Sequence, residues 1–381
     1  MHYLDNAATT PVLPEVRAAM EPYLTEDFGN ASSVHGFGRR AKQGVEDARD
    51  RVATAIGARP AEIVFTGGGT EADNLALIGT ATKLRGNGNH VVTTAFEHHA
   101  VLHSVEWLAQ QGFETTVLPV PESGVVDPGA VAAAVRPDTI VVSVMAVNNE
   151  IGTIQPVTEI ARQVKDANAR TLVHTDAVQA LPNLPVNVAA WGVDLASFSA
   201  HKLGGPKGVG TLFIRAGVPL APTVYGGGQE KGLRSGTLNV PGIAGFGVAA
   251  EIAAKEVHER IDRLGPLRDA LLDGIARAVP DALVNGDMER RIAANLSVAI
   301  PGAEGEVLIL LLDQAGIACS TGSACQSGAV DPSHVLLAIG RSKELANGSL
   351  RFSLGRSSTQ ADVDAVLDVL ARIVAQARRA A

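Results

Sequence analysis

Short runs rich in Val, Ile and Thr, separated by turns and helical patterns, constrain the fold of this chain more than any other feature of its sequence. They lie at residues 62–65, 90–94, 139–145, 171–174 and 211–214. Several are apolar throughout instead of alternating with polar residues, as strands are when helices cover both faces of their sheet. We therefore predict an α/β fold with a mainly parallel sheet covered by helices.

A second, smaller unit is expected because 381 residues exceed the usual size of one domain. From about residue 257 the pattern changes to longer helical stretches, followed by strand-like runs near 295–300 and 349–354. The predicted units are a large domain of residues 15–256 and a smaller α/β domain formed by residues 1–14 and 257–381.

The end of the sequence predicts a C-terminal helix that packs on the smaller domain. Thr359 is a suitable N-cap for it, and Asp362 lies in the first turn. The apolar residues that share one face of this helix are Val363, Val366, Leu367, Leu370 and Val374.

Charge and composition exclude several classes of function. The formal net charge is -8 without a basic cluster, whereas nucleic-acid binding depends on Lys and Arg that neutralise phosphates, so no direct nucleic-acid partner is expected. Residues 1–10 lack the pattern of a secretory signal, and the apolar run at 307–312 is too short to span a membrane. The only cysteines are Cys319 and Cys325, which is typical of a reducing compartment, and we expect the cytoplasm.

A glycine-rich turn follows the first strand-like run. Gly67, Gly68 and Gly69 precede a helical pattern that begins with Thr70. Glycines allow the backbone to approach a phosphate closely, and the start of a helix offers free N–H groups and a positive dipole end. Taken alone, such a cluster is as often simply a tight turn.

Asp176 and Gln179 follow the carboxyl end of the run that starts at residue 171. Ligands of parallel sheets bind at this edge, and a carboxylate there can keep a ring nitrogen protonated. An Asp that merely caps the next turn is, for this segment alone, the more common case.

A lysine ends another strand-like run, in the segment 194–210. Ser199, His201 and Lys202 come just before a glycine-rich turn. A lysine desolvated in this position can lose its proton and form a Schiff base. An isolated lysine is ordinarily a solvated charge, and this second interpretation suits Lys207 better than Lys202.

These three segments together meet the demands of pyridoxal 5'-phosphate. The glycine turn would hold the phosphate, Asp176 would keep the ring nitrogen protonated and Lys202 would attach the cofactor. We predict this cofactor and no metal.

Further short motifs occur in order along essentially the whole chain, at residues 3–11, 28–35, 97–99, 147–152, 197–202, 226–230, 234–237, 320–325 and 351–355. With these motifs the chain resembles the fold-type I enzymes of the class V aminotransferase-like group, and among them the cysteine desulfurases of the IscS/NifS type. The resemblance implies a homodimer that takes sulfur from L-cysteine and passes it to an acceptor protein.

The resemblance also implies roles for individual residues. His98 would stack on the cofactor ring and take part in proton transfer, and Arg351 would bind the substrate carboxylate. Without the resemblance, a satisfied interior histidine and a surface ion pair would be preferred for these two residues. The remaining implied contacts are Asn149 and Gln179 near the ring oxygen, with Asn149 also near the substrate, Gly69, Thr70, Ser199 and His201 around the phosphate, and Thr237 reaching in from a second subunit.

Cys325 lies in a segment of small residues, about 318–330, which suits a thiol that must move between substrate and acceptor. The resemblance implies that Cys325 receives the sulfur as a persulfide. Cys319 is interpreted as a bystander, with a second sulfur carrier or an internal disulfide left open.

The sequence thus predicts an enzyme that converts L-cysteine to L-alanine. Selenocysteine lyase, a plain class V aminotransferase and a non-catalytic protein on the same fold are the alternatives. Iron–sulfur cluster assembly is the preferred destination of the sulfur, with thiolation of tRNA or DNA as others.

Overall fold

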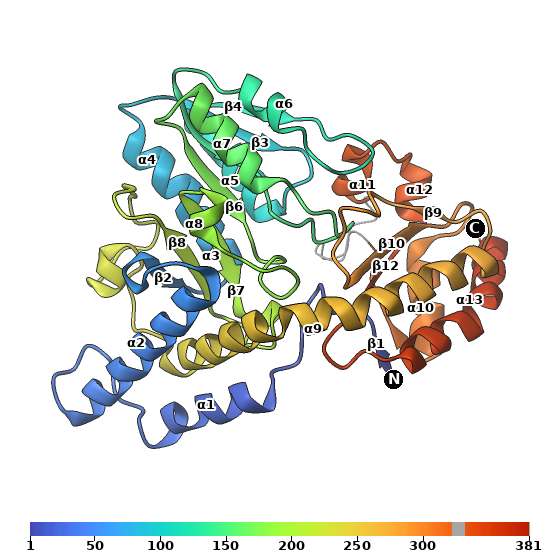
Figure 1. Ribbon diagram of the computed structural model, residues 1–381, viewed down its shortest axis with the longest axis horizontal. Coiled ribbons are helices and arrows are strands. Elements are labelled where there is room, and N and C mark those ends of the chain that lie inside the picture. The colour runs from blue at the N-terminus through green and yellow to red at the C-terminus, as the bar shows by residue number, and fades with distance from the viewer. Residues whose placement is uncertain (322–331, 381) are drawn as a thin grey trace.

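The computed structural model describes residues 1–321 and 332–380. A large, twisted sheet with helices on both sides forms one part, and a smaller sheet with its own helices lies beside it (Figure 1). This arrangement confirms the predicted α/β fold.

The large sheet has seven strands in the order β2-β8-β7-β6-β5-β3-β4. All neighbours are parallel except that β8 runs antiparallel to both β2 and β7. The predicted runs correspond to strands, while β4, at the edge and partly exposed, was not predicted. The strands are β2 (Ile63–Thr66), β3 (His90–Thr94), β4 (Glu114–Leu118), β5 (Thr139–Ser143), β6 (Leu172–Asp176), β7 (Leu195–Ser199) and β8 (Gly210–Ile214).

Both faces of this sheet are buried, as the apolar runs require. Val91 and Val141 belong to one apolar cluster, whereas the next residues along their strands, Val92 and Val142, belong to another. Successive side chains of a strand point to opposite faces, so helices cover the sheet on each side. The helices of this part are α1 (Pro14–Thr25), α2 (Gly36–Ile56), α3 (Gly69–Asn74), α4 (Thr80–Leu84), α5 (His99–Gln110), α6 (Pro128–Ala133), α7 (Val157–Ala167) and α8 (Val188–Trp191).

The smaller part is built on an antiparallel sheet in the order β12-β10-β9, formed by β12 (Ser349–Ser353), β10 (Asn295–Ala299) and β9 (Leu283–Val284). The N-terminal strand β1 (His2–Tyr3) pairs in parallel with β11 (Ile317–Ala318). The helices here are α10 (Gly305–Gln314), α11 (His334–Ala338), α12 (Lys343–Asn347) and α13 (Gln360–Ala380).

The C-terminal helix is as predicted. Thr359 shares two hydrogen bonds with Asp362 at the start of α13. Four of the five predicted apolar residues are buried, and Leu367 is partly buried against the same core.

The long helix α9 (Val240–Ala278) connects the two parts (Figure 1). It packs against α1 and α2 at one end and α13 at the other. One apolar core is continuous through both parts, including Val92 of the large sheet and Leu350 of the small one. Residue 257 lies within α9, so the division at that position stays a prediction. Among the described residues, no helix combines the length and apolar character needed to cross a membrane.

Candidate active site

The glycine turn connects the end of β2 to the start of α3. Gly68 has φ +154° and an open space where a Cβ would stand. A Cβ on Gly69 would lie 2.8 Å from the Val178 side chain, so only glycine fits there without displacement. The Gly67 N–H donates to the Glu71 carboxylate at 2.9 Å, and Arg234 donates to the same carboxylate at 2.8 Å. The chain is thereby folded tightly at the point where a phosphate was expected.

Asp176 ends β6 and is buried. It accepts a hydrogen bond from the Val178 N–H at 2.9 Å, so it does cap the following turn, and it also lines the cavity described below. Burial raises the pKa of this carboxyl, while the Val178 N–H and the charge of Lys202 act in the opposite direction. The two interpretations of Asp176 are therefore compatible.

Lys202 lies at the end of a short 3-10 turn, Ala200–Lys202, directly after β7. Its Nζ donates to the carbonyl oxygens of Ala7 at 2.6 Å and Ala8 at 2.8 Å. These carbonyls belong to the N-terminal motif at residues 3–11, and nothing in the sequence indicated that this motif contacts Lys202.

Two histidines near Lys202 are held neutral. His98 is the N-cap of α5, and its Nδ1 accepts a hydrogen bond from the Ala100 N–H at 3.1 Å, which leaves the proton on Nε2. Burial, followed by the charge of Lys202, lowers the pKa of His98 to about 4. The same two causes lower the pKa of His201 to about 4, and its Nδ1 lies 3.1 Å from the Thr9 hydroxyl.

Arg351 extends from β12, in the smaller sheet, toward the large one. It donates to the Asn149 carbonyl at 3.0 Å and to the Asp5 carboxylate at 2.8 Å. Its side chain is only 3% exposed, and its Nε is buried without a hydrogen-bond partner among the described residues. The Nε–H is thus a hydrogen-bond donor that no described residue uses.

The tandem asparagines have different roles. Asn148 is buried and fixes its loop, because its side chain donates to the Phe96 carbonyl and accepts from the Glu150 N–H. Asn149 instead lines the cavity, as does Gln179, whose amide donates to the Ala7 carbonyl at 3.0 Å.

A cavity of about 320 Å³ brings the predicted residues together. Those that line it are Gly69, Thr70, His98, Asn149, Asp176, Gln179, Ser199, His201, Lys202 and Arg351. A wider hollow of about 830 Å³ shares Gly69, Thr70, Ser199 and His201 and leads to the surface past Lys207. Thr237 is exposed and lines neither space, and Cys325 lies outside the described residues.

Known proteins are similar in sequence to almost the whole of this chain. The family model described as Aminotransferase class-V matches residues 2–366. A relative named Cysteine desulfurase IscS, from Methanosarcina thermophila, is 49% identical over 376 residues, covering 99% of this chain and 92% of the relative. A relative of the same name from Dictyoglomus turgidum is 48% identical, covering 99% and 95%. The chain belongs to the cysteine desulfurases of the class-V aminotransferase family.

Solved structures agree with this membership. A structure named NIFS-like protein is 41% identical with a TM-score of 0.93, covering 99% of this chain and 100% of that one. DndA from Streptomyces lividans is 40% identical with a TM-score of 0.78, covering 92% and 99%. A structure of SspA in complex with cysteine is 33% identical with a TM-score of 0.82, covering 93% and 99%.

Cysteine desulfurases of this family depend on pyridoxal 5'-phosphate, and the cavity fits that group. The glycine turn leaves open space at Gly68, and buried polar atoms lack partners among the described residues where a polar ligand would supply them. Two of these atoms, Asp73 Oδ1 and Arg351 Nε, belong to residues that line the cavity. The set of a carboxylate, a lysine and a hydroxyl-rich glycine turn matches the ring nitrogen, aldehyde and phosphate of the cofactor.

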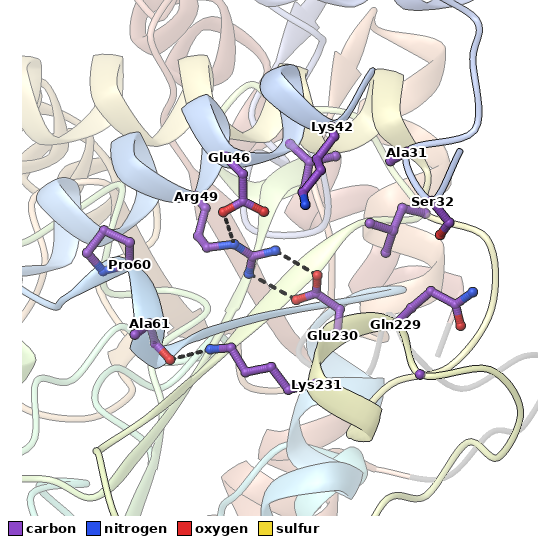
Figure 2. A pocket seen from close by; sticks show the side chains of 13 residues that line it. Ala31, Ser32, Lys42, Glu46, Arg49, Pro60, Ala61, Gln229, Glu230 and Lys231 are labelled. Carbon is purple, nitrogen blue, oxygen red and sulfur yellow. Dashed lines mark hydrogen bonds and ion pairs between the residues drawn. The ribbon is translucent and has the colours of Figure 1, made fainter. Parts of the chain in front are cut away.

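Another hollow, of about 560 Å³, lies over a buried ion pair that joins α2 to the motif at residues 226–230 (Figure 2). Both guanidinium ends of Arg49 donate to the Glu230 carboxylate, at 3.0 and 2.7 Å, and the Phe65 N–H donates to it at 2.8 Å. Glu230 and Lys231 both have positive φ, at 46° and 60°. This contact network holds a strained backbone in place next to β2.

Cys319 is the cysteine that the described residues include. It is a free thiol, 8% exposed, and burial raises its pKa to about 12. The thiolate is the nucleophilic form, so Cys319 is poorly suited to attack sulfur at neutral pH.

Sequence reasoning missed several residues at this site. Asp5 pairs with Arg351, and Ala7 and Ala8 hold Lys202 through backbone carbonyls, which no side-chain motif can reveal. Asp73 is a buried carboxyl that lines the cavity, and Glu97 is a buried carboxyl directly before His98 in the chain. Their only signal was their position, since Asp73 follows the glycine turn closely and Glu97 begins the motif at 97–99.

Proposed function

We propose that this cysteine desulfurase converts L-cysteine to L-alanine and carries the removed sulfur as a persulfide on Cys325 to an acceptor protein. One observation supports the proposal most. Lys202, Asp176, His98 and Arg351, which come from distant parts of the chain, line a single cavity of about 320 Å³.

Different residues around the cavity would bind different parts of the cofactor. The Gly67–Gly69 turn, Thr70, Ser199 and His201 would hold the phosphate, and Lys202 would be the point of covalent attachment. Asp176 would face the ring nitrogen, and Gln179 and Asn149 would lie near the ring oxygen. When bound, the cofactor supplies an electron sink that weakens the bonds at the substrate α-carbon.

Proton movement is assigned to Lys202 and His98. The carbonyls of Ala7 and Ala8 accept from Lys202 Nζ, and this contact gives the amine a defined position within the cavity. His98 is neutral and carries its proton on Nε2, so it can donate one hydrogen bond while it lies flat against an aromatic ring.

Substrate binding is assigned to Arg351. Its Nε has no partner among the described residues, and a planar guanidinium binds a carboxylate through two parallel hydrogen bonds. Because Asp5 and the Asn149 carbonyl already fix the guanidinium, it need not reorganise when the substrate arrives.

The final step needs a thiolate, and we assign it to Cys325. At an ordinary pKa of about 8.5 only a small fraction of a thiol is ionised at neutral pH, so proton removal must accompany the attack. The attack transfers the substrate sulfur to Cys325, and the carbon that loses it becomes the methyl group of alanine.

Assembly and cellular context complete the proposal. We propose a homodimer in which Thr237, exposed in one protomer, reaches the phosphate site of its partner. A free Cys319 thiol is consistent with a reducing compartment such as the cytoplasm. Iron–sulfur cluster assembly is the destination we favour, since the relatives are named IscS.

The test combines cofactor attachment with product analysis. Borohydride reduction of the purified protein should fix the cofactor to the peptide that contains Lys202, and L-cysteine should yield alanine and sulfide without an added keto acid. Lys202→Ala should abolish both results, whereas Lys207→Ala, at the nearby exposed lysine, should preserve attachment. Fixation of the cofactor in Lys202→Ala, or a requirement for a keto acid, would contradict the proposal.

A further inference from the structure

Asp73 is a buried acid in the cofactor cavity to which the proposed function assigns no role. It lies on α3, one turn after Thr70, and is 1% exposed. One of its carboxylate oxygens lies within 4.8 Å of both a ring nitrogen of His98 and a carboxylate oxygen of Asp176. Its Oδ1 has no hydrogen-bond partner among the described residues. Asp73 therefore contacts the same space as Asp176, with an unfilled capacity for a hydrogen bond.

Among the described residues, the groups that act on the charge of Asp73 include no cation that would balance a second negative charge. From β6 it faces Asp176 and His174, whose Nε2 lies 3.6 Å from Asp73 Oδ1. His174 is itself buried between Ser143 and Ser197, and burial lowers its pKa to about 3, so it is neutral.

The remaining elements around α3 do not change this balance. Before α5 lie Glu97, whose pKa burial raises to about 8, and the neutral His98. His99 and His103 lie on α5, and burial lowers the pKa of His99. Strands β2 and β8 carry no charged residue, and β7 contributes Ser197. On α3 itself, Glu71 is paired with Arg234. The charge of Lys202, which follows β7, lowers the pKa of Asp176.

Two carboxylates this close in a buried site cannot both be ionised at neutral pH. Burial, and next the charge of Asp176, raise the pKa of Asp73 well above its ordinary value. Asp176 has the more favourable surroundings for a charge, because the Val178 N–H and Lys202 stabilise its ionised form.

We propose that Asp73 retains its proton and acts as a neutral hydrogen-bond donor beside Asp176, so that Asp176 is the single ionised carboxylate opposite the cofactor ring nitrogen. This inference rests on the proposed function for the place of the cofactor. Asp73 is a positioning residue, because it acts on the cofactor through Asp176. A carboxylic acid kept neutral by a buried site can donate a hydrogen bond at pH 7.

Infrared difference spectroscopy reports the protonation state directly, in the full-length protein with the cofactor removed. Subtracting the spectrum of Asp73→Asn from that of the wild type at pH 7 should reveal the carbonyl band of a protonated carboxylic acid. Asp194→Asn is the matched control, since Asp194 is also buried but pairs with Lys165 at 2.7 Å and should give a carboxylate band instead. A carboxylate band for Asp73 would overturn the inference, whether or not the protein desulfurates cysteine.

The effect on the cofactor is measured by its affinity. Asp73→Ala removes a hydrogen-bond donor beside the charged Asp176 and should weaken cofactor binding about tenfold or more. Asp73→Asn keeps a neutral donor and should restore most of that affinity. If Asp73→Asn binds the cofactor as weakly as Asp73→Ala, the negative charge itself is needed and the inference fails.

Discussion

Replacing Arg351 by lysine should weaken binding of the amino-acid substrate far more than binding of the cofactor. The lysine keeps the positive charge but loses the planar edge that includes the unpartnered Nε, and it cannot hold Asp5 and the Asn149 carbonyl at once. Hydrogen bonds to charged groups contribute roughly 1.5–3 kcal/mol each. A net loss of about 2–3 kcal/mol corresponds to a dissociation constant roughly 30 to 150 times larger.

The assay is a titration of the visible absorption spectrum with L-alanine, which has the substrate carboxylate and amine but no sulfur, so turnover does not complicate the measurement. Arg291→Lys is the matched control, because Arg291 is also buried but donates to the Asn285 and Asp287 carbonyls away from the cavity. Arg291→Lys should reduce thermal stability without changing alanine affinity. An Arg351→Lys variant that binds alanine like the wild type, or that loses cofactor to the same extent, would refute the assignment of Arg351.

Other variants test the remaining assignments. Cys325→Ser should keep the cofactor and the spectral change induced by cysteine but lose alanine and sulfide production. Cys319→Ser should keep most activity, because burial raises the pKa of Cys319 to about 12. Mass mapping of the persulfide after one turnover checks both predictions. Thr237→Val should weaken cofactor affinity without changing the dimer mass in light scattering, and a monomer with full turnover would contradict the shared site. The wild-type apoprotein should lose stability as the pH rises from about 5 to 8, because burial raises the folded pKa of Glu97 to about 8 and the unfolded chain releases this proton earlier. Glu97→Gln should remove this loss, which is at most about 1.4 kcal/mol per pH unit in urea unfolding. Glu230→Gln should destabilise the protein by up to about 3–5 kcal/mol in the same assay, because the buried Arg49 then keeps only the half-exposed Glu46 as a counter-charge.

The sequence predicted the central strands because their signal is local. Val91 and Val92 are both apolar, and this is sufficient to indicate a strand buried on both faces. The edge strand β4 escaped prediction because Glu114 and its neighbours are partly exposed and its pairing with β3 depends on a distant segment. The length of α9 was not foreseen, since its burial depends on the contacts it makes with both parts of the protein.

At the site, too, residues with a local sequence signal could be predicted, whereas residues placed by contacts between distant segments could not. The glycine turn, Asp176 and Lys202 each end a recognisable strand, so their common edge could be inferred from the residues alone. His98 and Arg351 were expected only from the family resemblance. His98 lies in the loop between β3 and α5, where a histidine by itself indicates no role, and Arg351 lies within β12 of the smaller sheet. Asp73 was not singled out from the sequence. Its burial arises from the packing of α3 against β7, which spacing along the chain does not encode.

The N-terminal segment contacts both Lys202 and Arg351, the residues proposed to bind the cofactor and the substrate, although one follows β7 of the large sheet and the other lies in β12 of the small one. The chain enters beside β11, and the Asp5 carboxylate accepts from Arg351. The Ala7 N–H then donates to Ser353 of the small sheet, while the carbonyls of Ala7 and Ala8 accept from Lys202 of the large one. Residues 5–8 therefore contact both Lys202 and Arg351. Because most of these contacts use main-chain atoms, they depend on where the backbone runs, and side-chain patterns in the sequence could not have located them.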